Sequence, residues 1–279
     1  MAVERTFGDV SIDRVREYWN ARPCNIRHSP KPIGTREYFD DVERRKYFVE
    51  PHIPEFAEFA RWSERSVLEI GCGIGTDTVR FARAGANVTA VELSDESAAI
   101  ARQRVAVFDL GDRVQIRVGN AEELPAIVPP QRFDLVYSFG VIHHSPNPAR
   151  IVEHIRSYMD ATSELRLMVY ARVSYKLFWI MKEEGVWDMS RIDELIARNS
   201  EAQTGCPVTY TYTDDSVREL LAGFTVTNVR KAHIFTWDID AYRRYEYKKA
   251  REWATVSDAE LAILERELGW HLLVRARLR

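Results

Sequence analysis

Hydrophobic positions follow two alternating patterns from residue 66 onward. Short apolar runs predict buried strands, and the stretches between them repeat apolar residues every three or four positions, as on one face of a helix. This alternation is typical of a parallel sheet covered by helices on both faces. The pattern predicts seven strands, near residues 66–70, 87–92, 114–118, 134–138, 165–170, 224–230 and 270–277.

Three segments lie outside this minimal core, at residues 1–62, 171–212 and 233–265. The last two interrupt the core after the fifth and sixth predicted strands. Because ligands of open α/β sheets bind beyond the carboxyl ends of the strands, insertions at this edge are well placed to cover a ligand. We therefore expect an N-terminal helical lid, joined by the two insertions, on a domain of residues 63–279. Helices that only pad the sheet are the alternative.

Composition agrees with a globular protein. The chain has 279 residues, of which 46% are hydrophobic and 29% charged, so one α/β domain can bury a full core. The net charge of −3 gives no overall attraction to nucleic acid. No apolar run approaches the roughly 18 residues of a membrane span, and the first residues do not resemble a signal peptide. Cys24, Cys72 and Cys206 form no disulfide framework. We expect a cytoplasmic monomer or homodimer.

A glycine-rich turn follows the first predicted strand, with Gly71, Gly73 and Gly75 at alternate positions. Such a turn brings the backbone close to a ligand, because a Cβ would block the approach or forbid the needed φ. A dinucleotide fingerprint would place its third glycine one residue later, where this chain has Thr76. The turn also lacks the Lys-Ser/Thr pair of a phosphate-binding loop.

The spacing Glu69-x-Gly71-x-Gly73-x-Gly75 resembles motif I of the class I S-adenosylmethionine-dependent methyltransferases, and further motifs of that family follow in order over residues 64–170. The resemblance implies a Rossmann-like, doubly wound α/β fold with a mostly parallel seven-stranded sheet, whose last strand inserts antiparallel beside the fifth. It implies S-adenosylmethionine as cofactor and S-adenosylhomocysteine as product. The family members it points to act on small molecules of the quinone and natural-product type.

Two further segments complete the expected cofactor site. Glu92 ends the second predicted strand, where a carboxylate can accept hydrogen bonds from both ribose hydroxyls. Residues 119–125 resemble the family segment that addresses adenine, with Asn120 in place of the usual Asp; its amide oxygen can still accept from the exocyclic amine. A turn role without a ligand is the alternative for Asn120. The candidate cofactor-binding residues are Glu69, Gly71, Cys72, Gly73, Gly75, Glu92, Leu93, Asn120, Ala121 and Ser138.

Residues 133–146 resemble a family segment that contains two adjacent histidines, here His143 and His144. The sulfonium of S-adenosylmethionine is already an activated methyl donor, so the protein mainly has to hold a nucleophile in line with the methyl group. An imidazole titrates near neutrality, which makes His143 and His144 candidate general bases. The alternative is that they hydrogen-bond a loop carbonyl or cap the next helix.

Aromatic and basic residues are the candidates for binding the acceptor. Tyr170 ends the fifth predicted strand, Tyr210 and Tyr212 alternate in the first insertion, and Trp19 and Arg27 lie in the N-terminal segment. Aromatic walls suit a flat acceptor, and arginine suits an anionic group. Core packing of the tyrosines and a solvated charge cluster are the alternatives.

No metal site is evident in the sequence. Cys24 and Cys206 could meet across the lid and bind a soft ion such as arsenic, but Cys72 lies in the glycine turn, so the three thiols of arsenite methyltransferases are not matched. Residues 242–249 interleave bases and aromatics as in a nucleic-acid patch. A helix with packed stems and exposed charges fits that segment better.

The sequence thus predicts an S-adenosylmethionine-dependent methyltransferase that moves a methyl group to a small-molecule acceptor by in-line displacement. A nicotinamide-dependent oxidoreductase is the competing enzyme class, against which Thr76 argues. Two further hypotheses stay open at this point: a non-catalytic, cofactor-binding regulator, and a methyltransferase of protein or RNA.

Overall fold

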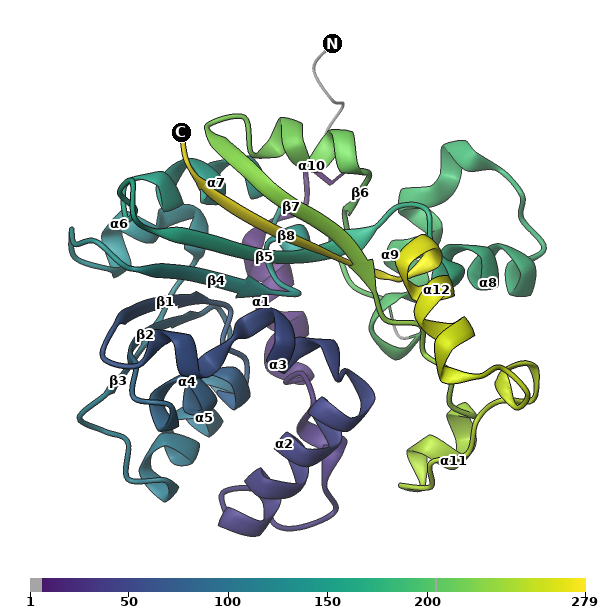
Figure 1. Ribbon diagram of the computed structural model, residues 1–279, viewed down its shortest axis with the longest axis horizontal. Helices are drawn as coiled ribbons and strands as arrows, with labels where there is room; N and C mark the ends of the chain where they lie inside the picture. Colours follow the sequence, from purple (N-terminus) through teal and green to yellow (C-terminus); the bar gives the residue numbers. More distant parts are fainter. Residues whose placement is uncertain (1–6, 204) are drawn as a thin grey trace.

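The computed structural model describes residues 7–203 and 205–279, and within them eight strands form one sheet (Figure 1). The order is β3-β2-β1-β4-β5-β8-β7, and the short β6 also pairs with β5. The strands are β1 Ser66–Ile70, β2 Asn87–Glu92, β3 Val114–Val118, β4 Leu135–Phe139, β5 Glu164–Ala171, β6 Thr211–Tyr212, β7 Phe224–Ala232 and β8 His271–Leu278.

Strands β1 to β6 pair in parallel, whereas β8 runs antiparallel between β5 and β7. The predicted, mostly parallel Rossmann-like sheet with an antiparallel last strand is therefore confirmed. The two-residue β6 was not among the predicted strands. None of the helices in the described part of the chain is long and apolar enough to cross a membrane.

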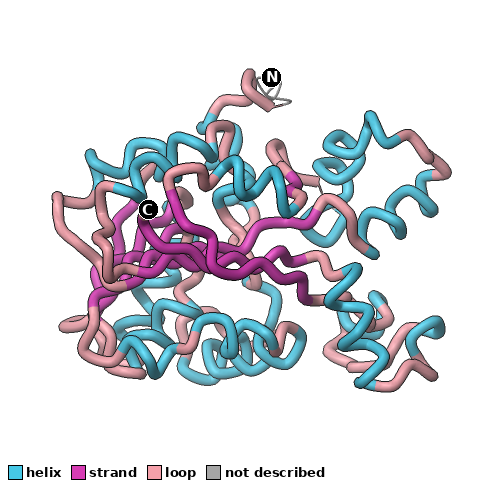
Figure 2. Tube along the Cα trace, turned by 45° about the horizontal axis from the view of Figure 1, so that its top comes forward, coloured by secondary structure: helices cyan, strands magenta, loops and turns pink. Residues whose placement is uncertain are grey.

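Successive residues of β1 point to opposite faces of the sheet, as alternation along a strand requires. Val67 packs in a core with Val79 and Ala101 of α4 and α5, while Leu68 packs in a second core with Ile155 of α7. Helices therefore cover both faces, as Figure 2 shows. They are α4 Thr76–Arg83, α5 Asp95–Val107, α6 Leu124–Ile127, α7 Pro148–Arg156 and α10 Asp214–Leu220.

The N-terminal segment consists of α1 Ile12–Ala21, η1 Ile26–His28, α2 Arg36–Val49, α3 His52–Ala57 and η2 Phe59–Trp62. Its last part belongs to the sheet core, because Ile53, Phe56 and Trp62 are buried together with β1 side chains. Helix α2 instead packs over Ile74 of the glycine turn, through Tyr38 and other apolar residues. The segment before α3 thus lies next to the predicted cofactor turn.

The two insertions are helical. The first holds α8 Tyr175–Glu184, η5 Met189–Arg191, α9 Ile192–Gln203 and β6, and the second holds α11 Ile239–Arg243, η6 Arg251–Trp253 and α12 Asp258–Leu268, whose end extends past residue 265. The Nη2 of Arg45 donates to the carbonyl of Tyr242 at 2.6 Å, and Tyr245 Oη donates to the carbonyl of Arg27 at 3.1 Å. These bonds join the N-terminal segment to the second insertion.

Candidate cofactor and acceptor site

The glycine turn after β1 closes onto the loop that follows β4. Gly71 has a φ of +78°, and a Cβ placed on it would lie 2.3 Å from both methyl groups of Val141. Gly73 has a φ of +54°, and nothing in the described chain lies within 4 Å of where its Cβ would be. Gly71 is therefore needed for packing, whereas Gly73 leaves room for a ligand to approach the backbone. Gly75 is the last residue before α4.

Glu92, at the end of β2, braces the same turn. Its Oε2 accepts a hydrogen bond from the amide of Gly73 at 2.7 Å, and its Oε1 accepts from the amide of Ser94 at 2.9 Å. Burial raises the pKa of Glu92, while the amides of Ser94, Gly73 and the half-buried Leu93 act in the opposite direction. Each carboxylate oxygen has a further lone pair, so Glu92 can hold the turn and still accept from a ribose hydroxyl.

Three other predicted cofactor residues, Glu69, Cys72 and Ser138, are buried and bonded within the protein. Thr78 Oγ1 donates to Glu69 Oε2 at 2.5 Å, and burial raises the pKa of that carboxyl group. Ser138 Oγ donates to the carbonyl of Ile70 at 3.1 Å, which ties β4 to β1. Burial also raises the pKa of the Cys72 thiol. These side chains support the turn from within the sheet.

Asp77, which no sequence pattern singled out, joins three elements. This buried carboxylate accepts hydrogen bonds from Lys46 Nζ at 2.7 Å and from the hydroxyls of Tyr47 and Tyr137, each at 2.9 Å. The donors come from α2 and β4, and Asp77 lies in the first turn of α4. It therefore holds α2 in place above the glycine turn.

The predicted adenine segment begins beside Glu92, because the amide of Gly119 donates to the Glu92 carbonyl at 2.9 Å. Asn120 Oδ1 accepts from the amide of Glu122 at 3.0 Å, so this side chain forms the local turn. Ala121 packs against the core on the α7 side. Because β1, β2 and β3 are parallel neighbours, their carboxyl ends bring the glycine turn, Glu92 and Asn120 to one edge of the sheet.

His143 follows β4 in the short 3-10 turn η4, Ile142–His144. The side chain is fully buried, and neither ring nitrogen has a hydrogen-bond partner among the described residues. Its ring centroid lies 4.1 Å from that of Tyr170 and 4.2 Å from that of His144. Burial, with His144 nearby, lowers the pKa of His143 well below its usual range. The imidazole is therefore neutral at physiological pH and offers one lone pair and one N–H.

His144 is bonded to the first insertion. Its Nδ1 lies 2.8 Å from the carbonyl oxygen of Val208 and 3.4 Å from both Cys206 Sγ and Thr209 Oγ1. A carbonyl only accepts, so Nδ1 carries the proton. The backbone repeats this link, because the amide of Tyr210 donates to the carbonyl of His143 at 2.9 Å. The first insertion thus covers both histidines.

Two of the predicted acceptor residues contact the histidines. Tyr170 touches His143 and also stacks on Trp270, with ring centroids 4.2 Å apart. Trp19 of α1 meets His144 edge-on, with centroids 5.4 Å apart. These aromatic and heteroaromatic rings come from the N-terminal segment, the loop after β4, β5 and the residue before β8.

The other three predicted acceptor residues are placed differently. Tyr210 contacts the ring of Phe7 at 5.1 Å between centroids. Tyr212 is buried in the core on the α7 side, and burial raises its pKa. Arg27 is exposed in η1, and Lys31 beside it forms an ion pair of 3.1 Å with Asp41.

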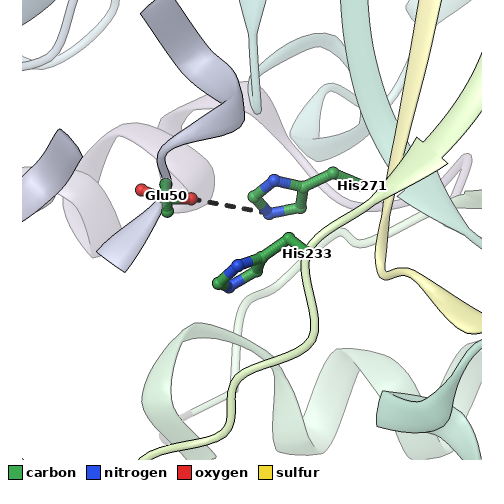
Figure 3. A group of neighbouring side chains, drawn as sticks. All are labelled: Glu50, His233 and His271. Atoms are coloured by element: carbon green, nitrogen blue, oxygen red, sulfur yellow. Dashed lines mark ion pairs between the residues drawn. The ribbon is translucent and has the colours of Figure 1, made fainter. Parts of the chain in front are cut away.

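The fold also brings together a second group of histidines, in a chain whose sequence predicted no metal site. His52 Nε2 lies 2.9 Å from His271 Nδ1, and the ring centroids of His233 and His271 are 4.7 Å apart. One ligand atom each from Glu50, His233 and His271 lies within 4.8 Å of the others (Figure 3). His52 and His271 are 219 positions apart, so no local pattern could have joined them.

Known proteins match the central part of this chain. Residues 67–161 match the family model of a methyltransferase domain. The ubiquinone biosynthesis O-methyltransferase of Xanthomonas euvesicatoria is 34% identical over 106 residues, which cover 38% of this chain and 43% of that protein. The one from Bordetella parapertussis is 38% identical over 90 residues, or 32% of this chain and 36% of that protein. The chain thus matches about two fifths of the length of these relatives.

Solved structures share the whole fold at low identity. Magnesium protoporphyrin IX methyltransferase from Synechocystis PCC 6803, with bound S-adenosylhomocysteine, has a TM-score of 0.61 over 96% of this chain and 100% of that chain, at 15% identity. The [4+2]-cyclase SpnF has a TM-score of 0.56 over 95% of this chain and 93% of that chain, at 17% identity. Residues 67–161 thus match a methyltransferase domain, and the chain shares the fold of these solved structures.

Proposed function

We propose that this protein transfers the methyl group of S-adenosylmethionine to a small-molecule acceptor bound beside His143. The observation that carries the proposal is the contact between Gly71 and Val141. Val141 precedes His143 by two residues, so the glycine turn and the buried imidazole lie on adjoining loops. A methyl donor held at the turn would therefore be close to a group held by His143.

The rings around His143 favour a flat acceptor. Tyr170, Trp270 and Trp19 provide aromatic surface with polar edges, which suits a planar molecule that carries a hydroxyl group. The named relatives are O-methyltransferases, which supports oxygen as the acceptor atom. Full burial of His143 favours a small acceptor over a protein or RNA.

In the proposed reaction, the acceptor oxygen attacks the methyl carbon in line with the sulfur. The bond from sulfur to the methyl carbon breaks as the bond from oxygen to that carbon forms. The acceptor proton passes to the neutral imidazole of His143, and S-adenosylhomocysteine and the methyl ether are released. Because the sulfonium needs no further activation, most of the rate gain comes from holding the two groups in line, which can supply about 7–11 kcal/mol.

We also propose that the N-terminal segment and the two insertions form a lid over the acceptor. The support is the set of contacts that joins them: Trp19 with His144, His144 with Val208, and Arg45 with Tyr242. Deleting residues 1–30 should then reduce turnover much more than the affinity for S-adenosylhomocysteine. Full turnover by the folded, truncated protein would contradict the lid.

Calorimetric titration tests the cofactor part of the proposal. The protein should bind S-adenosylhomocysteine and not NAD, and Glu92→Gln should weaken that binding several-fold or more, because the amide gives up one acceptor oxygen and the charge. Glu96→Gln is the matched control, since Glu96 is exposed on α5 four residues further on. Equal loss in both variants, or binding of NAD alone, would argue against this use of Glu92.

A further inference from the structure

Three ligand-type side chains from distant parts of the sequence converge at one place. Glu50 caps the end of α2, His233 directly follows β7, and His271 begins β8. Figure 3 shows His271 directed toward Glu50, with the ring of His233 beside that of His271; the three come from a strand, a helix end and a loop. One ligand atom of each lies within 4.8 Å of the others. Donors bound to one tetrahedral zinc ion at about 2.0–2.2 Å lie about 3.3–3.6 Å from one another, so side-chain rotations would have to bring these three closer by up to about 1.5 Å.

The distance between His271 and Glu50 leaves room for an ion between them. His271 Nε2 lies 3.7 Å from Glu50 Oε1, which is too long for a hydrogen bond. The other ring nitrogen, Nδ1, is 2.9 Å from His52 Nε2. If His271 donates from Nδ1 to His52, its Nε2 lone pair faces a carboxylate oxygen. A cation between these two acceptor atoms would be attracted by both.

His52 supplies the kind of second partner that metal-binding histidines have. A ligating histidine usually donates its other N–H to a neighbouring group, which fixes the ring orientation and the tautomer. The bond from His271 Nδ1 to His52 Nε2 would do this and leave Nε2 of His271 as the ligand atom.

The backbone at His233 is held in an uncommon conformation. Its φ is +70°, in the left-handed region that few residues other than glycine adopt. The carbonyl of His233 accepts a hydrogen bond from the amide of Trp270 at 2.8 Å, and Ala232 pairs with His271 across the sheet. The end of β7 is thus fixed so that the His233 ring lies next to His271.

We propose that Glu50, His233 and His271 bind a divalent transition metal ion, with zinc(II) as the best fit to two imidazoles and one carboxylate, and that His52 is a positioning residue for His271. Two histidines and one glutamate form a ligand set found in catalytic zinc sites, which keep a further position open. His271 stacks with Tyr170 at 6.1 Å between centroids, and Tyr170 also touches His143. The ion would therefore lie near the acceptor. Binding of the ion does not depend on the proposed function; its use in polarising an acceptor oxygen does.

The test is a titration of the chelator-treated, full-length protein with zinc chloride, in competition with a chromophoric chelator and without S-adenosylmethionine. One zinc ion should bind per chain. Glu50→Gln and His233→Asn should each weaken binding by roughly 100-fold or more, and His52→Ala by about 10–100-fold, the range for an outer-shell partner. His52→Gln should recover part of the loss, because the amide can still accept from His271. Asparagine is chosen at 233 because it tolerates the left-handed conformation.

Two control variants test whether zinc binds elsewhere on the protein. Cys24→Ser removes the exposed thiol, and His154→Asn removes a histidine on α7, so neither should change zinc affinity. Circular dichroism of each variant shows whether it is folded, and the absorption spectrum of the cobalt(II) form reports the geometry of the site. No zinc bound by the folded parent protein, or unchanged affinity in folded Glu50→Gln and His233→Asn, would overturn the proposal. Loss of binding in Cys24→Ser would also overturn it, by placing the ion elsewhere.

Discussion

His144 donates a hydrogen bond from Nδ1 to the backbone carbonyl of Val208, 2.8 Å away, which joins the loop after β4 to the first insertion. The neighbouring His143 has no hydrogen-bond partner for either ring nitrogen within the described residues. The two adjacent histidines therefore have different tasks. His144 holds the insertion in place, and we propose that His143, whose ring nitrogens have no partner among the described residues, meets the acceptor.

Substitutions of His143 and His144 should have different effects, the first on turnover and the second on stability. His143→Asn should lower turnover by roughly 10²–10⁴-fold and leave the affinity for S-adenosylhomocysteine nearly unchanged. His144→Ala should lower the free energy of unfolding by about 1–3 kcal/mol, because a buried carbonyl loses its donor. Single-turnover kinetics and denaturant titrations measure the two effects. Full turnover by His143→Asn would mean that proximity alone drives the reaction.

The pH dependence of turnover follows from the environment of His143. Burial lowers the pKa of this imidazole well below its usual range, so the ring stays neutral across neutral pH. As pH falls through that lowered pKa, the base becomes protonated and the rate should drop. The acid limb of the pH–rate profile should thus lie well below the usual histidine pKa of about 6.5. A limb near the usual value would point to a solvated base instead.

Substitutions of Gly71 and Gly73 test whether the first is needed for packing and the second for the approach of a ligand. Gly71→Ala should destabilise the protein by roughly 2–5 kcal/mol, because its Cβ would meet Val141 and its φ is positive. Gly73→Ala meets no neighbour in the described chain, so only the cost of its φ applies, about 1–2 kcal/mol. Its main effect should be weaker cofactor binding. Equal destabilisation in denaturant titrations would contradict this distinction.

Asp77 should contribute to the stability of the fold, because it is buried and accepts hydrogen bonds from α2 and β4. Asp77→Asn leaves the ammonium of Lys46, whose side chain is 12% exposed, without its 2.7 Å counter-charge. Removing one partner of a buried ion pair typically costs about 3–5 kcal/mol of unfolding free energy. The double variant Lys46→Met, Asp77→Asn should recover much of the loss, as measured by denaturant titration. No recovery would show that the bonds of Asp77 to the tyrosines matter more.

Much of the fold could be predicted because its signals are local. Strand periodicity located β1 to β5, β7 and β8, and the glycine spacing located the turn whose positive φ values and close packing demand glycine. The capping box at Ser257 and Glu260, a sequence signal for the start of α12, is present with both of its bonds. Each of these features depends on residues a few positions apart.

The remaining parts depend on contacts between distant residues. Asp77 and Lys46 are 31 positions apart, and His52 and His271 are 219 apart, so neither pair leaves a periodic signal. The alternation of threonine and tyrosine in residues 209–212 likewise could not show whether the tyrosines face a pocket or are buried in the core. The structure buries Tyr212 in the core on the α7 side and places Tyr210 against Phe7.

The most direct test of the proposed reaction is an isotope-transfer measurement. The protein is incubated with S-adenosylmethionine carrying a deuterated methyl group and with a fractionated cell extract, and each fraction is analysed by mass spectrometry. We expect a deuterium-labelled small molecule that forms together with S-adenosylhomocysteine and is strongly reduced with His143→Asn. Label found in protein or RNA instead of a small molecule, or no S-adenosylhomocysteine formed with any fraction, would contradict it.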